Sequence, residues 1–162
     1  MIPALRKQFN SSFSPAKYQT FLRRMDEICG THVQFRLSET PCFFPKSLID
    51  RMALDGQELI RQLVENPSYR TKSDEAVPAE FKVPNEASHP MFVQVDFGLV
   101  RDGDGQLQPK LVELQAFPSL YAYQAFLSQL YIDVYGLNDP AFGSLQYFLS
   151  GLTTDSYREL LR

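Results

Sequence analysis

Residues 92–116 have the sequence FVQVDFGLVRDGDGQLQPKLVELQA, and this stretch decides the fold class. Apolar and polar residues alternate over about 92–100 and again over 107–116, a pattern that predicts two β-strands. Between the two runs lie two consecutive Asp-Gly pairs, at 102–105. An Asp-Gly pair between alternating runs is a strong signal for a tight turn. The segment therefore predicts a long antiparallel hairpin.

Helical patterns occur on both sides of this hairpin. Apolar residues recur at helical spacing over 14–29, 47–65, 118–135 and 154–162. A shorter alternating run at 33–37 predicts one more strand. We therefore expect an α+β fold, in which several helices cover a mixed sheet that is built around the hairpin.

The length of 162 residues fits a single domain with a sizeable core. Residues 68–90 are polar, contain Pro78 and Pro84 and show no sustained period, so we predict a long surface loop there. The last helical pattern stops at Arg162 without a C-terminal stop signal. This ending leads us to expect that the chain is the N-terminal part of a longer protein.

Composition limits the partners. A net charge of -3 and a pI near 5.4 disfavour nucleic acid, which needs a basic surface. Because no apolar run is long enough to cross a bilayer, we expect no membrane partner. Cys29 and Cys42 are expected to be reduced and buried, as is typical of a cytoplasmic protein. With 13 Phe, 8 Tyr and no Trp, the core should be rich in aromatic side chains.

The hairpin also carries the residues with most chemical interest. Alternation places Gln94, Asp96, Glu113 and Gln115 on one face, opposite an apolar face. A two-residue or a four-residue turn makes Asp96 and Glu113 diagonal neighbours, roughly 7–8 Å apart. Two carboxylates at that separation could share one Mg²⁺, beside the amide oxygen of Gln115.

A simpler interpretation of the same pattern is a solvated face. Half-buried antiparallel hairpins commonly have one apolar and one polar face. His89, which precedes Pro90 just before the hairpin, could likewise serve as an acid or base, although a single loop histidine is usually incidental. Spacing alone leaves both interpretations of the polar face open.

The same residues resemble a known family. Val95-Asp96-Phe97, Gly105, Val112-Glu113-Leu114-Gln115-Ala116 and Pro118-Ser119-Leu120-Tyr121 are similar to the synthetase domain of glutathionylspermidine synthases and related ATP-grasp ligases. In that family an Asp on one strand and a Glu-x-Asn on the next hold Mg²⁺ against nucleotide phosphates. The similarity covers about thirty residues.

The resemblance implies site residues, cofactors and a reaction. Asp96, Glu113 and Gln115 would be the metal ligands, and Mg²⁺ and ATP the cofactors. Gln94 stands where the family usually has an Arg, and together with Ser119 it is a candidate for substrate contact. Ser119 is equally a candidate cap for the following helix. The implied reaction joins a carboxylate, activated as an acyl phosphate, to an amine of a small-molecule substrate.

Two functions remain open at this point. The chain is either the metal-binding segment of an ATP-dependent carboxylate–amine ligase, or a non-catalytic domain that keeps the fold and has another binding role. The hairpin pattern Asp…Glu-x-Gln favours the ligase. The non-catalytic domain is favoured by Gln94 and by the lack of a Gly-rich phosphate-covering loop in the sequence.

Overall fold

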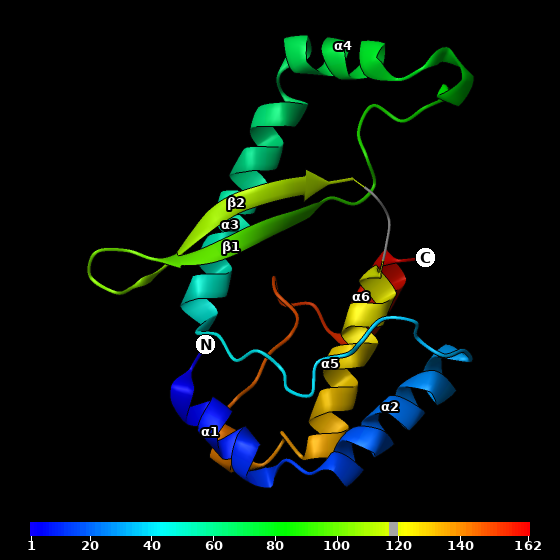
Figure 1. Cartoon of the computed structure of the whole chain (residues 1–162). Coiled ribbons are helices and arrows are strands. Elements are labelled where there is room, and N and C mark those ends of the chain that lie inside the picture. Colours follow the sequence, from blue (N-terminus) through cyan, green and yellow to red (C-terminus); the bar gives the residue numbers. More distant parts are fainter. Residues whose placement is uncertain (117–119) are drawn as a thin grey trace. The chain divides into compact units, whose positions relative to one another are not determined.

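The computed structural model describes residues 1–116 and 120–162, and these residues have the predicted α+β fold (Figure 1). The α-helices are α1 (Pro3–Ser12), α2 (Pro15–Cys29), α3 (Lys46–Val64), α4 (Pro67–Ala76), α5 (Tyr121–Tyr135) and α6 (Thr154–Leu160). The strands β1 (Gln94–Arg101) and β2 (Leu107–Gln115) form an antiparallel hairpin. Short 3-10 helices are η1 (Ala79–Phe81) and η2 (Pro140–Phe142). In the described residues, the hairpin is the whole of the sheet.

Two compact units can be distinguished along the chain. The first unit consists of residues 1–45 and 120–162, and the described part of the second unit is residues 46–116. The first unit contains α1, α2, α5 and α6, whereas the second contains α3, α4 and the hairpin. The expectation of a single domain stays a prediction.

The first unit contains an aromatic core. Its most deeply buried side chains are Phe9, Phe21, Met25 and Leu130, which come from α1, α2 and α5. Around them lie further buried aromatic residues, Phe43, Tyr131, Tyr135 and Phe142. The rings of Phe21 and Tyr131 are stacked with centroids 4.5 Å apart, which joins α2 to α5. The predicted aromatic character of the core is thus confirmed.

The strand expected at 33–37 does not form. This segment is irregular, and the carbonyl groups at its end are bonded by tyrosine side chains instead of a neighbouring strand. The Tyr18 hydroxyl donates to the Leu37 carbonyl at 2.7 Å, and the Tyr131 hydroxyl donates to the Ser38 carbonyl. Leu37 is buried whereas Phe35 is exposed. The alternating apolar residues at 33–37 therefore belong to an irregular segment that contacts the core through Leu37 and not to a strand.

In the second unit the hairpin crosses α3 (Figure 1). Gly56 is buried in the middle of α3, and a Cβ atom there would lie 3.3 Å from Val95 Cγ2 of β1. The Arg51 guanidinium of α3 donates to Gln108 Oε1 at 2.8 Å, which ties α3 to β2. A Cβ atom at 3.3 Å would be an unusually tight contact, so glycine at position 56 favours the close approach of Val95 to α3.

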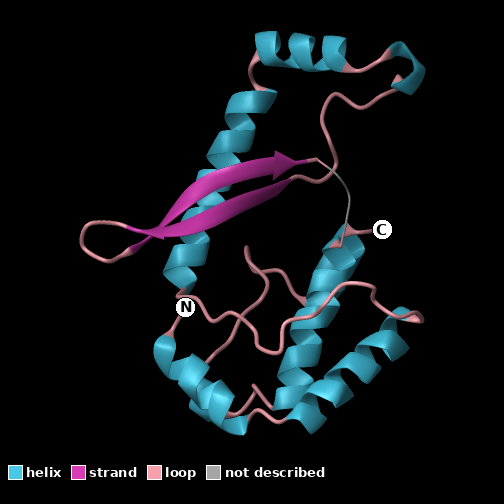
Figure 2. Cartoon of the chain, in the orientation of Figure 1, coloured by secondary structure: helices cyan, strands magenta, loops and turns pink. Residues whose placement is uncertain are grey.

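Residues 67–76 are helical, so the predicted loop at 68–90 is wrong over its first part (Figure 2). Asn66 is the N-cap, its side chain accepting from the Tyr69 amide at 3.0 Å, and Pro67 occupies the first turn. The dipeptide that ends α3 therefore also starts α4. No residue of α4 is buried, which is why its sequence shows no apolar period.

Both cysteines are free thiols. Cys29 is half-buried at the end of α2, whereas Cys42 is exposed, so the expectation that both are buried is wrong for Cys42. Among the described residues, no helix has the length and apolar content that crossing a bilayer requires.

Candidate functional site

The candidate site lies at the end of the hairpin far from its turn. Cα partners there are Gln94 with Gln115 and Asp96 with Glu113. Partners in an antiparallel pair project to the same side of the sheet, so these four side chains share one face, which we call the polar face. The opposite face carries Val95 against α3. The predicted grouping of the four residues on one face is found.

The predicted register, however, is wrong. Arg101 pairs with Leu107, so the loop contains residues 102–106 and is longer than either expected turn. The Asp102 side chain stabilises this loop by accepting from the amides of Asp104 at 3.0 Å and Gln106 at 2.8 Å. These two hydrogen bonds to the Asp102 carboxylate are not part of the simple Asp-Gly turn that was predicted.

A β-bulge then restores the alignment of the polar residues. Phe97 pairs with Leu111 whereas Asp96 pairs with Glu113, so Val112 is an extra residue on β2. An unbroken ladder would continue from Phe97–Leu111 to Asp96–Val112 and would turn Glu113 to the apolar face. With the bulge, Asp96 and Glu113 are directly opposite rather than diagonal, and Cβ atoms so placed are about 4.5–5.5 Å apart.

Carboxamide groups bridge the two carboxylates. Gln94 Nε2 donates to Asp96 Oδ1 at 3.0 Å, and Gln115 Nε2 approaches Asp96 Oδ2 at 3.5 Å. Gln115 Nε2 also donates to Glu113 Oε1. Asp96 is half-buried and Glu113 exposed, and neither forms an ion pair with a Lys, Arg or His in the part of the chain that the structure describes.

The donor set suits a hard cation only in part. Within residues 1–116 and 120–162, no group of three or more His, Cys, Asp and Glu side chains is placed to hold a metal ion. Two opposed carboxylates nevertheless match what Mg²⁺ commonly takes from a protein, since water and phosphate oxygens complete its shell. The Gln115 carboxamide would have to rotate to present Oε1 in place of Nε2.

The other residues that the sequence suggested for the site are Gln94, Ser119 and His89. Gln94 lies in the polar face, where its side chain donates to Asp96; its predicted contact with substrate stays a prediction. Ser119 lies outside the described residues. His89 is exposed and its Nδ1 lies 3.3 Å from the Pro90 carbonyl oxygen.

Comparison with protein-family models, with curated proteins and with solved structures gives no match for this chain. The resemblance to ATP-grasp ligases stays a prediction.

Proposed function

We propose that the polar face of the hairpin binds Mg²⁺ through Asp96 and Glu113, and that the chain is the metal-binding segment of an ATP-dependent carboxylate–amine ligase. The observation that carries this proposal is the direct pairing of Asp96 with Glu113 across the bulged ladder. Like charges directly opposite on a sheet destabilise it. A cation that is shared by the two carboxylates removes this repulsion, and in a ligase it also neutralises charge on the nucleotide phosphates.

A second candidate function is a non-catalytic domain that keeps only the fold. Gln94 and Gln115 favour it, because their amide groups already donate to both carboxylates without any cation. In this alternative the four residues form a hydrogen-bonded surface patch. The two candidates differ in a measurable way, since only the first requires stabilisation by Mg²⁺.

Thermal unfolding in the presence of Mg²⁺, of ATP and of both tests the proposal. A ligand that binds only the native state raises the free energy of unfolding by RT ln(1 + [L]/Kd), about 1.4 kcal/mol at a tenfold excess over Kd. The test variant is Asp96→Asn with Glu113→Gln, which keeps size and removes both charges. The matched control is Asp104→Asn with Glu75→Gln, two exposed carboxylates of the same unit.

We expect Mg²⁺ to raise the Tm of the wild type and of the control, with a larger rise for Mg·ATP, and no rise in the test variant. Mg²⁺ stabilisation without any ATP effect would retain the cation site and exclude the nucleotide. Absence of any shift in the wild type, or equal shifts in all three proteins, would contradict the proposal.

A further inference from the structure

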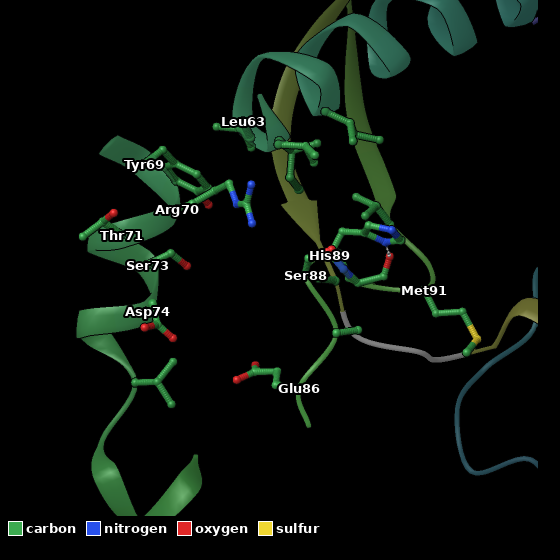
Figure 3. A pocket seen from close by; sticks show the side chains of 18 of the residues that line it. Leu63, Tyr69, Arg70, Thr71, Ser73, Asp74, Glu86, Ser88, His89 and Met91 are labelled. Atoms are coloured by element: carbon green, nitrogen blue, oxygen red, sulfur yellow. Dashed lines mark hydrogen bonds between the residues drawn. The ribbon is translucent and has the colours of Figure 1, made fainter. Parts of the chain in front are cut away.

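A second concave site lies in the second unit. An open cavity of about 1050 Å³ is lined by the C-terminal part of α3, by α4, by residues 86–91 and by the ends of both strands (Figure 3). This volume is slightly above the range of about 300–1,000 Å³ that is typical of small-molecule sites. Neither Asp96 nor Glu113 lines it.

One wall of the cavity is apolar. It is formed by Ile60 and Leu63 of α3 together with Val93 and Leu114 at the strand ends, and we call these four side chains the apolar floor. Val95 and its partner Leu114 lie on the face of the hairpin opposite to the polar face. The cavity and the proposed cation site are therefore on opposite sides of the same hairpin.

Arg70 supplies the positive charge of this cavity. Figure 3 shows its guanidinium group reaching from α4 toward the side of the cavity that is formed by the hairpin and by His89. Among the described residues Arg70 forms no ion pair with a carboxylate, whereas ten ion pairs are found between other residues of the same described part. Arg70 is exposed to solvent and borders the cavity. From this position its guanidinium group can bind a carboxylate ligand through two parallel hydrogen bonds.

The negative charges of the cavity limit what the ligand can be. Asp74 and Glu86 lie farther along the cavity from Arg70 (Figure 3). Lys82 Nζ lies 3.7 Å from Asp74, and Glu86 has no ion pair among the described residues. A polyanion such as a nucleoside triphosphate would meet stronger repulsion from these carboxylates than a single carboxylate placed beside Arg70.

We propose that this cavity binds a small monocarboxylate with an apolar body. The ligand carboxylate pairs with Arg70, and the hydrocarbon part contacts the apolar floor. The cavity is large enough for a chain of several carbons, and each methylene that is transferred from water further stabilises the complex. This site does not depend on the proposed cation site, because the two share no residue.

Octanoate is the probe for the test, and NMR amide-shift titration gives both its affinity and its location. We expect saturable shifts at Leu63, Arg70 and Leu114, and at least tenfold weaker binding of octan-1-ol, which lacks the charge. Arg70→Gln should weaken octanoate binding at least tenfold. Arg70→Lys should bind with intermediate affinity, since it keeps the charge but loses the planar fork.

Two controls separate this proposal from its alternatives. Lys72→Gln removes a positive charge from the same helix but from outside the cavity, so it should bind octanoate like the wild type. Asp96→Asn with Glu113→Gln should also bind octanoate normally, whatever it does to Mg²⁺ binding. Unsaturable shifts, equal binding by Arg70→Gln, or tighter binding of octyl phosphate than of octanoate would overturn the proposal.

Discussion

The Val95 side chain packs directly against the backbone of Gly56, where a Cβ atom would lie 3.3 Å from Val95 Cγ2. Glycine within a helix costs roughly 0.5–1 kcal/mol relative to alanine. Gly56 nevertheless lies in the middle of α3, where Val95 of β1 packs against it. The unfavourable helix propensity of Gly56 is therefore offset by close packing between α3 and β1.

Gly56→Val should lower the free energy of unfolding by about 1–3 kcal/mol, because the added methyl groups overlap with Val95. Urea denaturation of the whole chain measures the effect. Adding Val95→Ala to Gly56→Val should restore part of the loss, a coupling that a double-mutant cycle quantifies.

The control for this prediction is Gly103→Val, because a Cβ atom at Gly103 would meet nothing within 4 Å. That substitution should change stability by less than about 0.5 kcal/mol. Equal losses at Gly56 and Gly103, or no recovery with Val95→Ala, would mean that packing against Val95 is not the reason for glycine in α3.

Asn66→Ala should increase the hydrogen-exchange rates of the first amides of α4. The Asn66 side chain accepts from the Tyr69 amide at 3.0 Å, and loss of such a cap costs about 0.5–2 kcal/mol. Since α4 buries none of its residues, packing cannot compensate for the lost cap. Asn66→Asp keeps the acceptor and should exchange like the wild type. Unchanged exchange in Asn66→Ala would show that α4 does not need its cap.

The hairpin loop predicts a pH effect. Hydrogen bonds from the Gln108 side chain, and then from the amides of Gln106 and Asp104, lower the pKa of Asp102 below that of an ordinary Asp. An Asp with a depressed pKa stabilises the fold above the unfolded pKa of about 3.9, and this contribution is lost as the pH falls through the folded pKa.

NMR titration of the Asp102 carboxyl group measures this shift. We expect the Asp102 pKa of the wild type to lie below that of an ordinary Asp and to rise in Gln108→Ala, because the strongest donor is removed. Asp102→Asn should make the unfolding free energy less dependent on pH below about pH 4. If Gln108→Ala leaves the Asp102 pKa where it was, the Gln108 bond is not its cause.

The predicted helices and the hairpin follow local chemistry, and the structure confirms them with small differences at their ends. The predicted start of the helix over 118–135 lies outside the described residues, which contain this helix from Tyr121 onward. Ser14 and Pro15 begin α2 as an N-cap and a first-turn proline, and Gly30 ends it in a left-handed conformation. Strand alternation likewise places Gln94 and Asp96 on one face without any knowledge of tertiary contacts. Features that are encoded within a few neighbouring residues were thus predictable.

The geometry of the candidate site was not predictable in the same way. Val112 is not a glycine, and its neighbours give no other signal for a bulge. The loop length depends on hydrogen bonds to the Asp102 side chain, which a turn rule does not include. The loop is one residue longer than the predicted four-residue loop, and the bulge adds one more residue to β2. Together they shift the pairing at the candidate site by two residues relative to the predicted register. A shift by two keeps every side chain on its face, so the four polar residues were grouped correctly with the wrong pairing.

Helix α4 and the irregular segment at 33–37 were misjudged because tertiary context decides them. A polar helix with no buried residue has no apolar period, and its main signal is the cap at Asn66. Alternation at 33–37 predicts a strand only if a partner strand exists. Here the hydroxyl groups of Tyr18 and Tyr131, which are distant in sequence, donate hydrogen bonds to the carbonyl groups of Leu37 and Ser38.

The central claim is that Asp96 and Glu113 share a divalent cation. Mn²⁺ favours the same oxygen ligands as Mg²⁺ and broadens NMR signals near its binding site, so substoichiometric Mn²⁺ locates the site directly. We predict selective broadening of the Asp96 and Glu113 amides, reversal by excess Mg²⁺, and loss of the effect in Asp96→Asn with Glu113→Gln. Broadening centred on Asp102 and Asp104 of the loop, or no selective broadening, would contradict the account.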